Sequence, residues 1–184
     1  MSPWCTLPVC DGSAMLIRAY GLNWNPMVVD WGRVGAGNQG ILKGKVKIDG
    51  AAYEVDFWRA QGVYLLLEHF RPVYVGKAFG TRLGPRLRNH LTDRFAGRWD
   101  MFSWFTLSTV NKTSLNVRDP GQRQLKPETV NDTLEAIAIL ISEPPLNRKR
   151  ESLPDAAEAE QVGAPQPRSY RSYLEEIIKR LDEM

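Results

Sequence analysis

The sequence predicts an α/β (α+β) chain with a small, mainly antiparallel central sheet flanked by helices, an N-terminal β extension and a C-terminal amphipathic helix. Three patterns support this fold class. Apolar runs at 63–67 and 73–75 enclose a turn-like Glu-His-Phe-Arg-Pro segment and predict a β-hairpin. Asp49-Gly50, between two alternating stretches, predicts a second hairpin. Segments 127–143 and 169–184 repeat apolar residues with helical periodicity.

Local signals place the other strands and the first helix. Strands are expected at 15–20 and 41–48, and the aromatic run at 98–105 is expected to form a third strand beside the first hairpin. Gly84-Pro85 is typical of the first turn of a helix, because the N–H that proline lacks would be unpaired there. Leu87, in that helix, is expected to face the core.

The second helix is expected to begin at Pro127 and to end before Pro144-Pro145, because proline cannot continue a helix. Glu135 lies at the boundary of its apolar stripe. Taken alone, such a glutamate is either a solvated flank residue or a site residue. The stripe itself follows the i, i+3, i+4, i+7 pattern of Leu134, Ile137, Ala138 and Ile141.

The sequence divides into an N-terminal β extension at 1–58, a central domain at 59–150, a linker at 151–168 and a final helix at 169–184. The linker is rich in Ala, Glu and Pro and is expected to be exposed. The final helix cannot bury its apolar stripe alone. It is therefore expected to dock on its own domain, on a second copy to form a homodimer, or on another partner.

Composition limits the location and the partners of the chain. The longest apolar run, 136–141, is far shorter than the ~20 residues that a membrane span needs, and no secretory signal is seen, so we expect a cytoplasmic protein without membrane association. Two cysteines and two histidines are too few and too scattered for a zinc site. Segment 71–98 holds seven Lys or Arg residues and one acid, Asp93, which favours a polyanionic partner.

Further basic residues are candidates for contact with such a partner. Lys43, Lys45 and Lys47 share one face of an expected strand, which is either a solvated sheet face or a face that contacts DNA phosphates. The long polar segment 108–126 is a candidate DNA-recognition loop. The arginines and lysines assigned to DNA contact are Arg82, Arg88, Arg94, Lys112, Arg118, Arg123 and Arg148.

A set of short motifs resembles the GIY-YIG nucleases, and most of all their restriction-endonuclease branch. Gly62-Val63-Tyr64 and Tyr74-Val75-Gly76 match the paired tripeptides, with valine in place of the usual isoleucine. Arg86 and His90 follow at a spacing of four, and Glu135 and Asn147 at a spacing of twelve. The resemblance covers about residues 60–150. It implies a nuclease-like fold of the central domain.

The resemblance also implies a role for each matched residue. Glu135 would bind one Mg²⁺ (or Mn²⁺) ion per site, and Asn147 would hold Glu135 or the DNA backbone in place. Tyr64 would orient or deprotonate the attacking water, and since an unperturbed phenol is a weak base at neutral pH, a cation is needed beside it. Lys77 and His90 are the candidates for that cation.

Two further roles concern the phosphate. Tyr74 would donate a hydrogen bond to a phosphate oxygen or to the water, unless it is only a structural strand residue. Arg86 would bind the scissile phosphate through its planar fork of donors. Arg82 is a rival for that role, because the turn before Arg86 is about two residues longer than is usual in the family.

The function expected from this resemblance is that of a divalent-metal-dependent DNA endonuclease of the restriction or defence type. Two alternatives that act on DNA stay open, besides a purely structural or protein-interaction domain, against which the same site residues stand. The first is a genome-maintenance or mobile-element nuclease that acts on branched or damaged DNA. The second is a DNA-binding module that has lost catalysis, against which stands the presence of all the matched site residues together.

Overall fold

The computed structural model describes residues 16–33, 39–121, 125–142, 153 and 156–163. Several predictions made from the sequence fall outside these ranges. They concern the final helix at 169–184 and three single residues, Arg123, Asn147 and Arg148.

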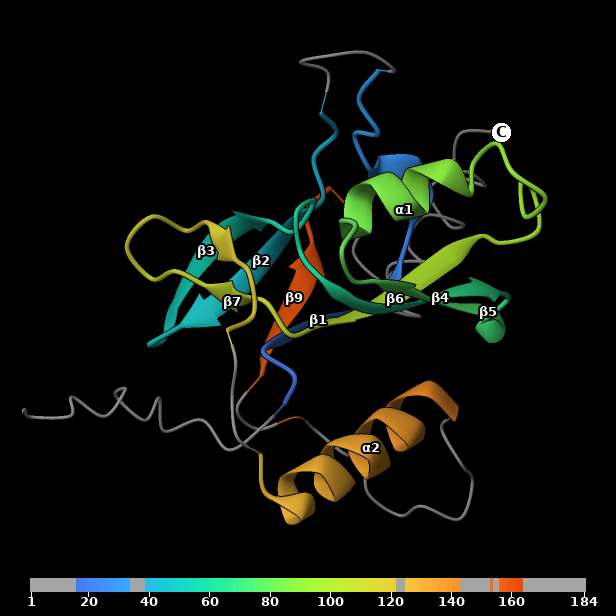
Figure 1. Ribbon diagram of the computed structural model, residues 1–184. Coiled ribbons are helices and arrows are strands. Elements are labelled where there is room, and N and C mark those ends of the chain that lie inside the picture. Colours follow the sequence, from blue (N-terminus) through green and yellow to red (C-terminus); the bar gives the residue numbers. More distant parts are fainter. Residues whose placement is uncertain (1–15, 34–38, 122–124, 143–152, 154–155, 164–184) are drawn as a thin grey trace, which may run out of the picture.

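The fold is a mixed α+β architecture dominated by one sheet of seven strands (Figure 1). The sheet runs in the order β3-β2-β9-β1-β6-β4-β5, and every pair is antiparallel except β1 with β9. The predicted N-terminal extension and central domain therefore share a single sheet. The strands are β1 (Ala19–Trp24), β2 (Lys43–Ile48), β3 (Ala51–Asp56), β4 (Gly62–Glu68), β5 (Arg71–Ala78), β6 (Met101–Thr106) and β9 (Ala157–Gln161).

Both predicted hairpins are confirmed, and each closes through a two-residue turn. Asp49 and Gly50 join β2 to β3 with φ of 51° and 84°, and His69 and Phe70 join β4 to β5 with φ of 51° and 65°. Two successive positive φ angles match the twist of the flanking strands. The predicted third strand is also confirmed, because β6 pairs along β4.

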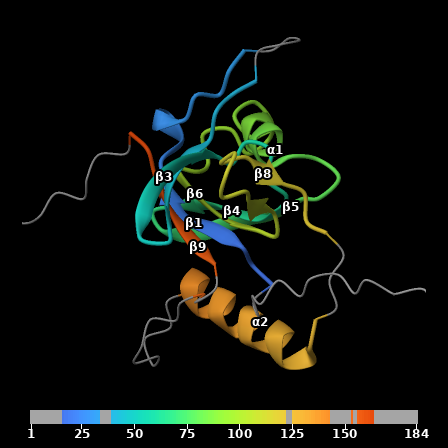
Figure 2. The same cartoon turned by 90° about the vertical axis from the view of Figure 1, so that its left-hand side faces the viewer.

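Two helices cover opposite faces of the sheet (Figures 1 and 2). Helix α1 (Leu83–Asn89) packs through Leu83 and Leu87 into the larger core cluster, which contains Tyr64 and Leu66; we call this side the α1 face. Helix α2 (Pro127–Ser142) packs on the other side, which we call the α2 face. It contacts the side chains of β4 that alternate with Tyr64 and Leu66. Alternation along β4 thus separates the two faces.

The apolar stripe predicted for α2 is wrong in part. Leu134 is 59% exposed and Ala138 is also exposed, whereas Ile137 and Ile141 pack only partly against the core. The helix is apolar on most sides between 134 and 141, so its sequence contains several overlapping helical stripes. The side chains that the helix buries are Thr133, Ala136, Ile139 and Leu140.

The prediction of an exposed linker at 151–168 is also wrong for the part of it that the structure describes, residues 153 and 156–163. Residues 157–161 form β9 between β1 and β2, Ala159 is 2% exposed, and Leu153 is equally buried. The segment 108–126, predicted to be an irregular loop, contains a small hairpin of β7 (Thr109–Val110) and β8 (Val117–Arg118). Leu115 and Val117 pack this hairpin against the core of the α1 face.

Within these described ranges, no helix has both the length and the apolar character needed to cross a membrane. The longest described helix, α2, has 16 residues.

Candidate functional site

A chain of hydrogen bonds links three polar side chains on the α1 face. The phenol oxygen of Tyr64 lies 2.7 Å from Nε2 of His90, and Nδ1 of His90 lies 2.6 Å from Oδ2 of Asp93. Tyr64 is 0% exposed and His90 is 4% exposed, whereas the Asp93 side chain is 36% exposed. The chain therefore runs from the protein interior to the surface.

Each member of this chain is placed by its local structure. Tyr64 lies directly opposite Gly76 in the β4–β5 ladder, and the missing side chain of the glycine leaves space for the phenol. His90 is the C-cap of α1, and the chain continues in a turn in which the Asp93 N–H donates to the Asn89 carbonyl. A spacing of three in such a turn brings Asp93 to the same side as His90.

Aromatic rings enclose the imidazole of His90. Its ring centroid lies 5.6 Å from that of Tyr64, 5.2 Å from that of Tyr74 and 5.4 Å from that of Phe95. Trp99 also donates from Nε1 to the His90 carbonyl at 3.3 Å. Because these rings exclude water, the hydrogen bonds of the imidazole are stronger than they would be in solvent.

Arg86 and Tyr74 complete the cluster around the Tyr64 phenol. The pKa of Tyr64 is raised from 10.0 to about 12, chiefly by burial and to a lesser degree by Tyr74, while the positive charge and hydrogen bonding of Arg86 lower it. The Nε of Arg86 is buried and has no hydrogen-bond partner among the described residues. The cluster thus combines a neutral phenol with a guanidinium that has donor capacity to spare.

Asp93 carries a negative charge at neutral pH. Partial burial raises the pKa of its carboxyl, but the hydrogen bonds from the Phe95 N–H and from His90, together with the charge of Arg94, lower it below its usual range. The N–H of Phe95 donates to Oδ1 at 2.8 Å, so both carboxylate oxygens are engaged.

Arg82, the sequence-based rival of Arg86, is engaged elsewhere. Its guanidinium forms an ion pair with Asp119, in which Nη2 lies 3.0 Å from Oδ2, and it also donates to the carbonyl of Arg59. Asp119 in turn accepts from Gln61 at 3.1 Å. These contacts fix the turn that precedes α1, and they leave Arg86 as the arginine beside Tyr64.

Arg88 also has structural partners. Its Nη1 donates to the carbonyls of Trp31 and Arg33, and its guanidinium lies 5.6 Å from the Trp58 ring centroid. Arg94, by contrast, stacks at 4.8 Å over the exposed side of Phe95, beside the cluster. Of the arginines that follow Arg82, Arg86 and Arg94 are therefore the two best placed for a ligand.

Two residues predicted for the site are not brought to it. Lys77 pairs with Val63 in the β4–β5 ladder and is exposed on the α2 face, so the expected cation beside Tyr64 is Arg86 instead. Glu135 is exposed on α2, the helix that covers the α2 face, and the sheet separates it from Tyr64. For Lys77 the physical reason is alternation, because neighbouring strand residues face opposite ways. For Glu135 the reason is that its helix, α2, packs on the α2 face.

The described residues do not fit a Mg²⁺ centre at the Tyr64 cluster. The nearest carboxylate, Asp93, is occupied by His90 and Phe95, and Glu135 is on the other face. Nowhere in the described ranges do three His, Cys, Asp or Glu side chains gather in a group that could hold a metal ion.

Some basic residues outside α1 are paired with acids. Lys112 binds Asp49 at 2.9 Å, which ties the loop between β7 and β8 to the β2–β3 turn. Lys43 pairs with Glu54 at 3.6 Å, and Lys45 lies between Glu54 and Glu160 in the sheet. The lysine face of β2 thus matches the solvated alternative better than the DNA-contacting one. Arg118 is exposed on β8.

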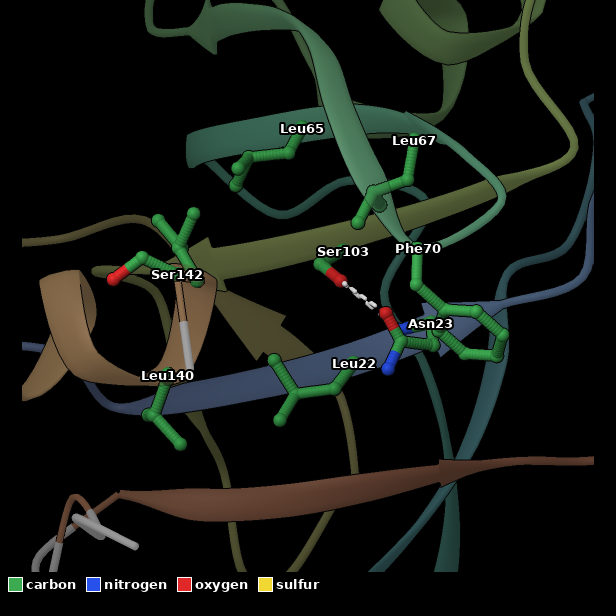
Figure 3. A pocket seen from close by; sticks show the side chains of 9 residues that line it. Leu22, Asn23, Leu65, Leu67, Phe70, Ser103, Leu140 and Ser142 are labelled. Carbon is green, nitrogen blue, oxygen red and sulfur yellow. Dashed lines mark hydrogen bonds between the residues drawn. The ribbon is translucent and has the colours of Figure 1, made fainter. Parts of the chain in front are cut away.

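A small cavity of about 80 Å³ lies on the α2 face, between the end of α2 and the β4–β5 turn (Figure 3). Asn23 and Ser103 approach one another at its centre, and apolar side chains form most of its wall. Leu65, Leu67 and Leu140 are among these side chains. Its lining holds no titratable side chain, so the cavity offers no acid, base or cation for chemistry.

Sequence reasoning predicted Tyr64, Tyr74, Arg86 and His90, and the structure brings these four together. It missed Asp93, which appeared only as the single acid of a basic segment. A usable signal existed: an acid three residues after a histidine at the end of a helix can reach its ring.

Comparisons of the chain with protein-family models, with curated proteins and with solved structures find no match. The structural basis for a function is therefore the cluster of Tyr64, Tyr74, Arg86, His90 and Asp93.

Proposed function

We propose that this protein is a DNA endonuclease that hydrolyses phosphodiester bonds at the Tyr64 cluster. The observation that carries the proposal is the 2.7 Å hydrogen bond between the Tyr64 phenol and Nε2 of His90, with the Arg86 guanidinium beside the phenol. This combination offers a proton acceptor and a phosphate-binding cation within one cluster.

The chemistry follows from the needs of the reaction. Hydrolysis forms a bond between a water oxygen and phosphorus, breaks the bond to the leaving oxygen and builds negative charge on the phosphate. Arg86 would bind that charge through its fork of donors. As the water attacks, its proton passes to the Tyr64 oxygen while the phenol proton passes to Nε2 of His90. Solvent then protonates the leaving oxygen.

The high pKa of Tyr64 supports a relay in preference to a preformed phenolate. At a pKa of about 12 the phenol is neutral near pH 7 and cannot act as a base by itself. Its hydrogen bond to an imidazole provides an acceptor for the phenol proton at the moment of attack. His90 is therefore the final acceptor of that proton.

Burial of Tyr64 sets a condition on substrate binding. The phenol is 0% exposed, whereas Tyr74 and Arg86 beside it are partly exposed. A phosphate that draws the Arg86 guanidinium toward itself would uncover the phenol oxygen. Substrate binding is thus expected to open the cluster to the attacking water.

The test is cleavage of supercoiled plasmid in Mg²⁺ or Mn²⁺ by wild type, Tyr64→Phe and Tyr53→Phe. Tyr53 is a matched control, because it is a 38% exposed tyrosine on β3, away from the cluster. We expect cleavage by wild type and by Tyr53→Phe, and a loss of at least about 100-fold in Tyr64→Phe. Equal cleavage by all three would overturn the assignment of Tyr64.

The metal requirement needs its own experiment, because the resemblance and the geometry predict different outcomes for Glu135→Ala. Glu135 is exposed, so alanine there leaves the fold intact, and Asp132→Ala is a matched control on the same helix. Loss of cleavage in Glu135→Ala alone would support the Mg²⁺ ligand that the resemblance implies. Retained cleavage would support a Tyr64 cluster that works without Glu135.

The second candidate function is a DNA-binding module without catalysis. The observation in its favour is that the phenol is sealed from solvent while Arg86 and Arg94 remain accessible. A wild-type protein that shifts duplex DNA on a gel but leaves plasmid intact in both metals would favour this alternative. Discrete fragments would favour a restriction-type nuclease. Cleavage only at DNA junctions would favour a genome-maintenance nuclease.

A further inference from the structure

The carboxylate of Asp93 determines which nitrogen of His90 carries the proton. An ionised carboxylate can only accept hydrogen bonds, and Oδ2 of Asp93 lies 2.6 Å from Nδ1 of His90. In the neutral imidazole the single ring proton is then on Nδ1. Nε2 is left bare and can accept the Tyr64 proton at 2.7 Å.

From this geometry we propose that Asp93 is a positioning residue, which holds His90 as the Nδ1–H tautomer so that Nε2 is the acceptor for the Tyr64 phenol. The arrangement is a tyrosine–histidine–aspartate chain, in which the outer acid orients the imidazole and stabilises the imidazolium that forms during proton transfer. The catalytic consequence rests on the proposed function. The tautomer itself does not.

The second oxygen of Asp93 makes the role specific to a carboxylate. Oδ1 accepts from the Phe95 N–H at 2.8 Å while Oδ2 accepts from His90. The side chain of asparagine has one carbonyl oxygen and one NH₂ group. If that oxygen keeps the hydrogen bond from the Phe95 N–H, the NH₂ group faces Nδ1. It can donate to Nδ1 only if that nitrogen carries no proton.

Asp93→Asn is therefore expected to reverse the direction of the hydrogen bonds that His90 makes with residue 93 and with Tyr64. Nδ1 of His90 would become an acceptor, Nε2 would carry the proton, and the bond to Tyr64 would run from the imidazole to the phenol oxygen. The ring would keep its place and its packing against Tyr74 and Phe95, but Nε2 could no longer accept a proton.

The direct test is the ¹⁵N NMR spectrum of the two imidazoles in the full chain. The protein has only two histidines, and His69 lies in the β4–β5 turn, so His69→Gln assigns the His90 signals. We expect Nδ1 of His90 to be protonated in wild type and Nε2 to be protonated in Asp93→Asn. A wild-type spectrum with the proton on Nε2 would overturn the inference without any need for the variant.

Kinetics on the plasmid substrate supply the second measurement. Asp93→Asn is expected to lower kcat by about 10- to 1000-fold and to leave KM nearly unchanged, since Asp93 acts through the His90 ring. Asp132→Asn, an exposed acid on α2, is the matched control and is expected to behave as wild type. A higher KM with unchanged kcat in Asp93→Asn would contradict the positioning role.

The two measurements separate the inference from the proposed function. If wild type shows the Nδ1–H tautomer, which changes in Asp93→Asn, and yet never cleaves DNA, the positioning role of Asp93 stands and the nuclease proposal fails. If wild type cleaves DNA and Asp93→Asn cleaves equally well with a changed tautomer, the nuclease proposal stands and the relay through Nε2 is refuted.

Discussion

Tyr64 and Gly76 lie directly opposite each other in the β4–β5 ladder, and the phenol of the tyrosine covers the backbone of the glycine. A Cβ atom added to Gly76 would overlap Cζ and Oη of Tyr64 and lie 2.8 Å from Cε1. The glycine of the second tripeptide motif is thus a packing partner of the tyrosine of the first.

Gly76→Ala is therefore expected to destabilise the protein by about 1–3 kcal/mol, because the ring must move in a closely packed core. The same movement would lengthen the hydrogen bond to His90. Urea denaturation measures the free energy of unfolding. Gly121→Ala is the control, since a Cβ there meets nothing within 4 Å, and it should unfold at nearly the wild-type urea concentration.

Stability should depend on the ionisation of Tyr64 at alkaline pH. Its pKa rises from 10.0 in the unfolded chain to about 12 in the folded one, so the folded state keeps the proton longer. The resulting contribution to stability is complete below pH 10 and falls as the pH rises toward 12. Wild type should lose stability faster than Tyr64→Phe over this interval. Parallel stability curves for the two proteins would contradict the shift.

Arg82 and Arg86 should separate into a structural and a ligand-binding residue. Arg82→Ala breaks a partly exposed ion pair with Asp119 and is expected to cost roughly 0.2–1 kcal/mol of stability. Arg86→Ala is expected to weaken duplex binding at least about tenfold and to reduce the slope of log affinity against log salt by about 0.9. Fluorescence anisotropy at several NaCl concentrations measures both affinities. A larger loss of affinity in Arg82→Ala would reverse the assignment.

The strand assignment of 157–161 can be tested at Ala159. This residue is 2% exposed, and its carbonyl accepts from the Trp24 indole at 3.1 Å. Ala159→Asp would bury a charge and is expected to cost about 3 kcal/mol or more. Its exposed neighbour gives the control: Glu160→Gln should stay within about 0.5 kcal/mol of wild type. An Ala159→Asp protein as stable as wild type would restore the linker interpretation.

The hairpins could be predicted because their turns and their alternation agree. Asp49-Gly50 tolerates positive φ at both positions, and the apolar runs of β4 and β5 are bounded by glycine. The exposed side of α2 could not be predicted, since its residues 134–141 are mostly apolar and only the shape of the sheet selects which of them are buried.

β9 could not be predicted for a different reason. Its sequence, Ala-Glu-Ala-Glu-Gln, has low strand propensity and becomes a strand through pairing on both edges. Gly44 lies so close that a Cβ there would come within 2.9 Å of the Ala159 methyl group. This tight position favours a small residue, and small residues give no hydrophobic signal.

The site was predicted where a residue type and a motif spacing coincide, as for Tyr64, Arg86 and His90. Lys77 was misplaced because strand alternation was not applied to the motif. Lys77 lies three residues after Tyr74 in β5 and therefore faces the opposite way, and the register pairs it with Val63. Asp93 acts through a hydrogen bond to a side chain, and no pattern of apolar residues reports such a bond.

The central position of β9 has a consequence for how the protein folds during its synthesis on the ribosome. The hairpin of β4 and β5 can pair with β6 as soon as residue 106 has emerged. The hairpin of β2 and β3 is made earlier, yet among the described strands it joins the sheet through β9, whose last residue is Gln161. During synthesis its inner edge therefore stays open to incorrect pairing until more than fifty further residues have followed β6.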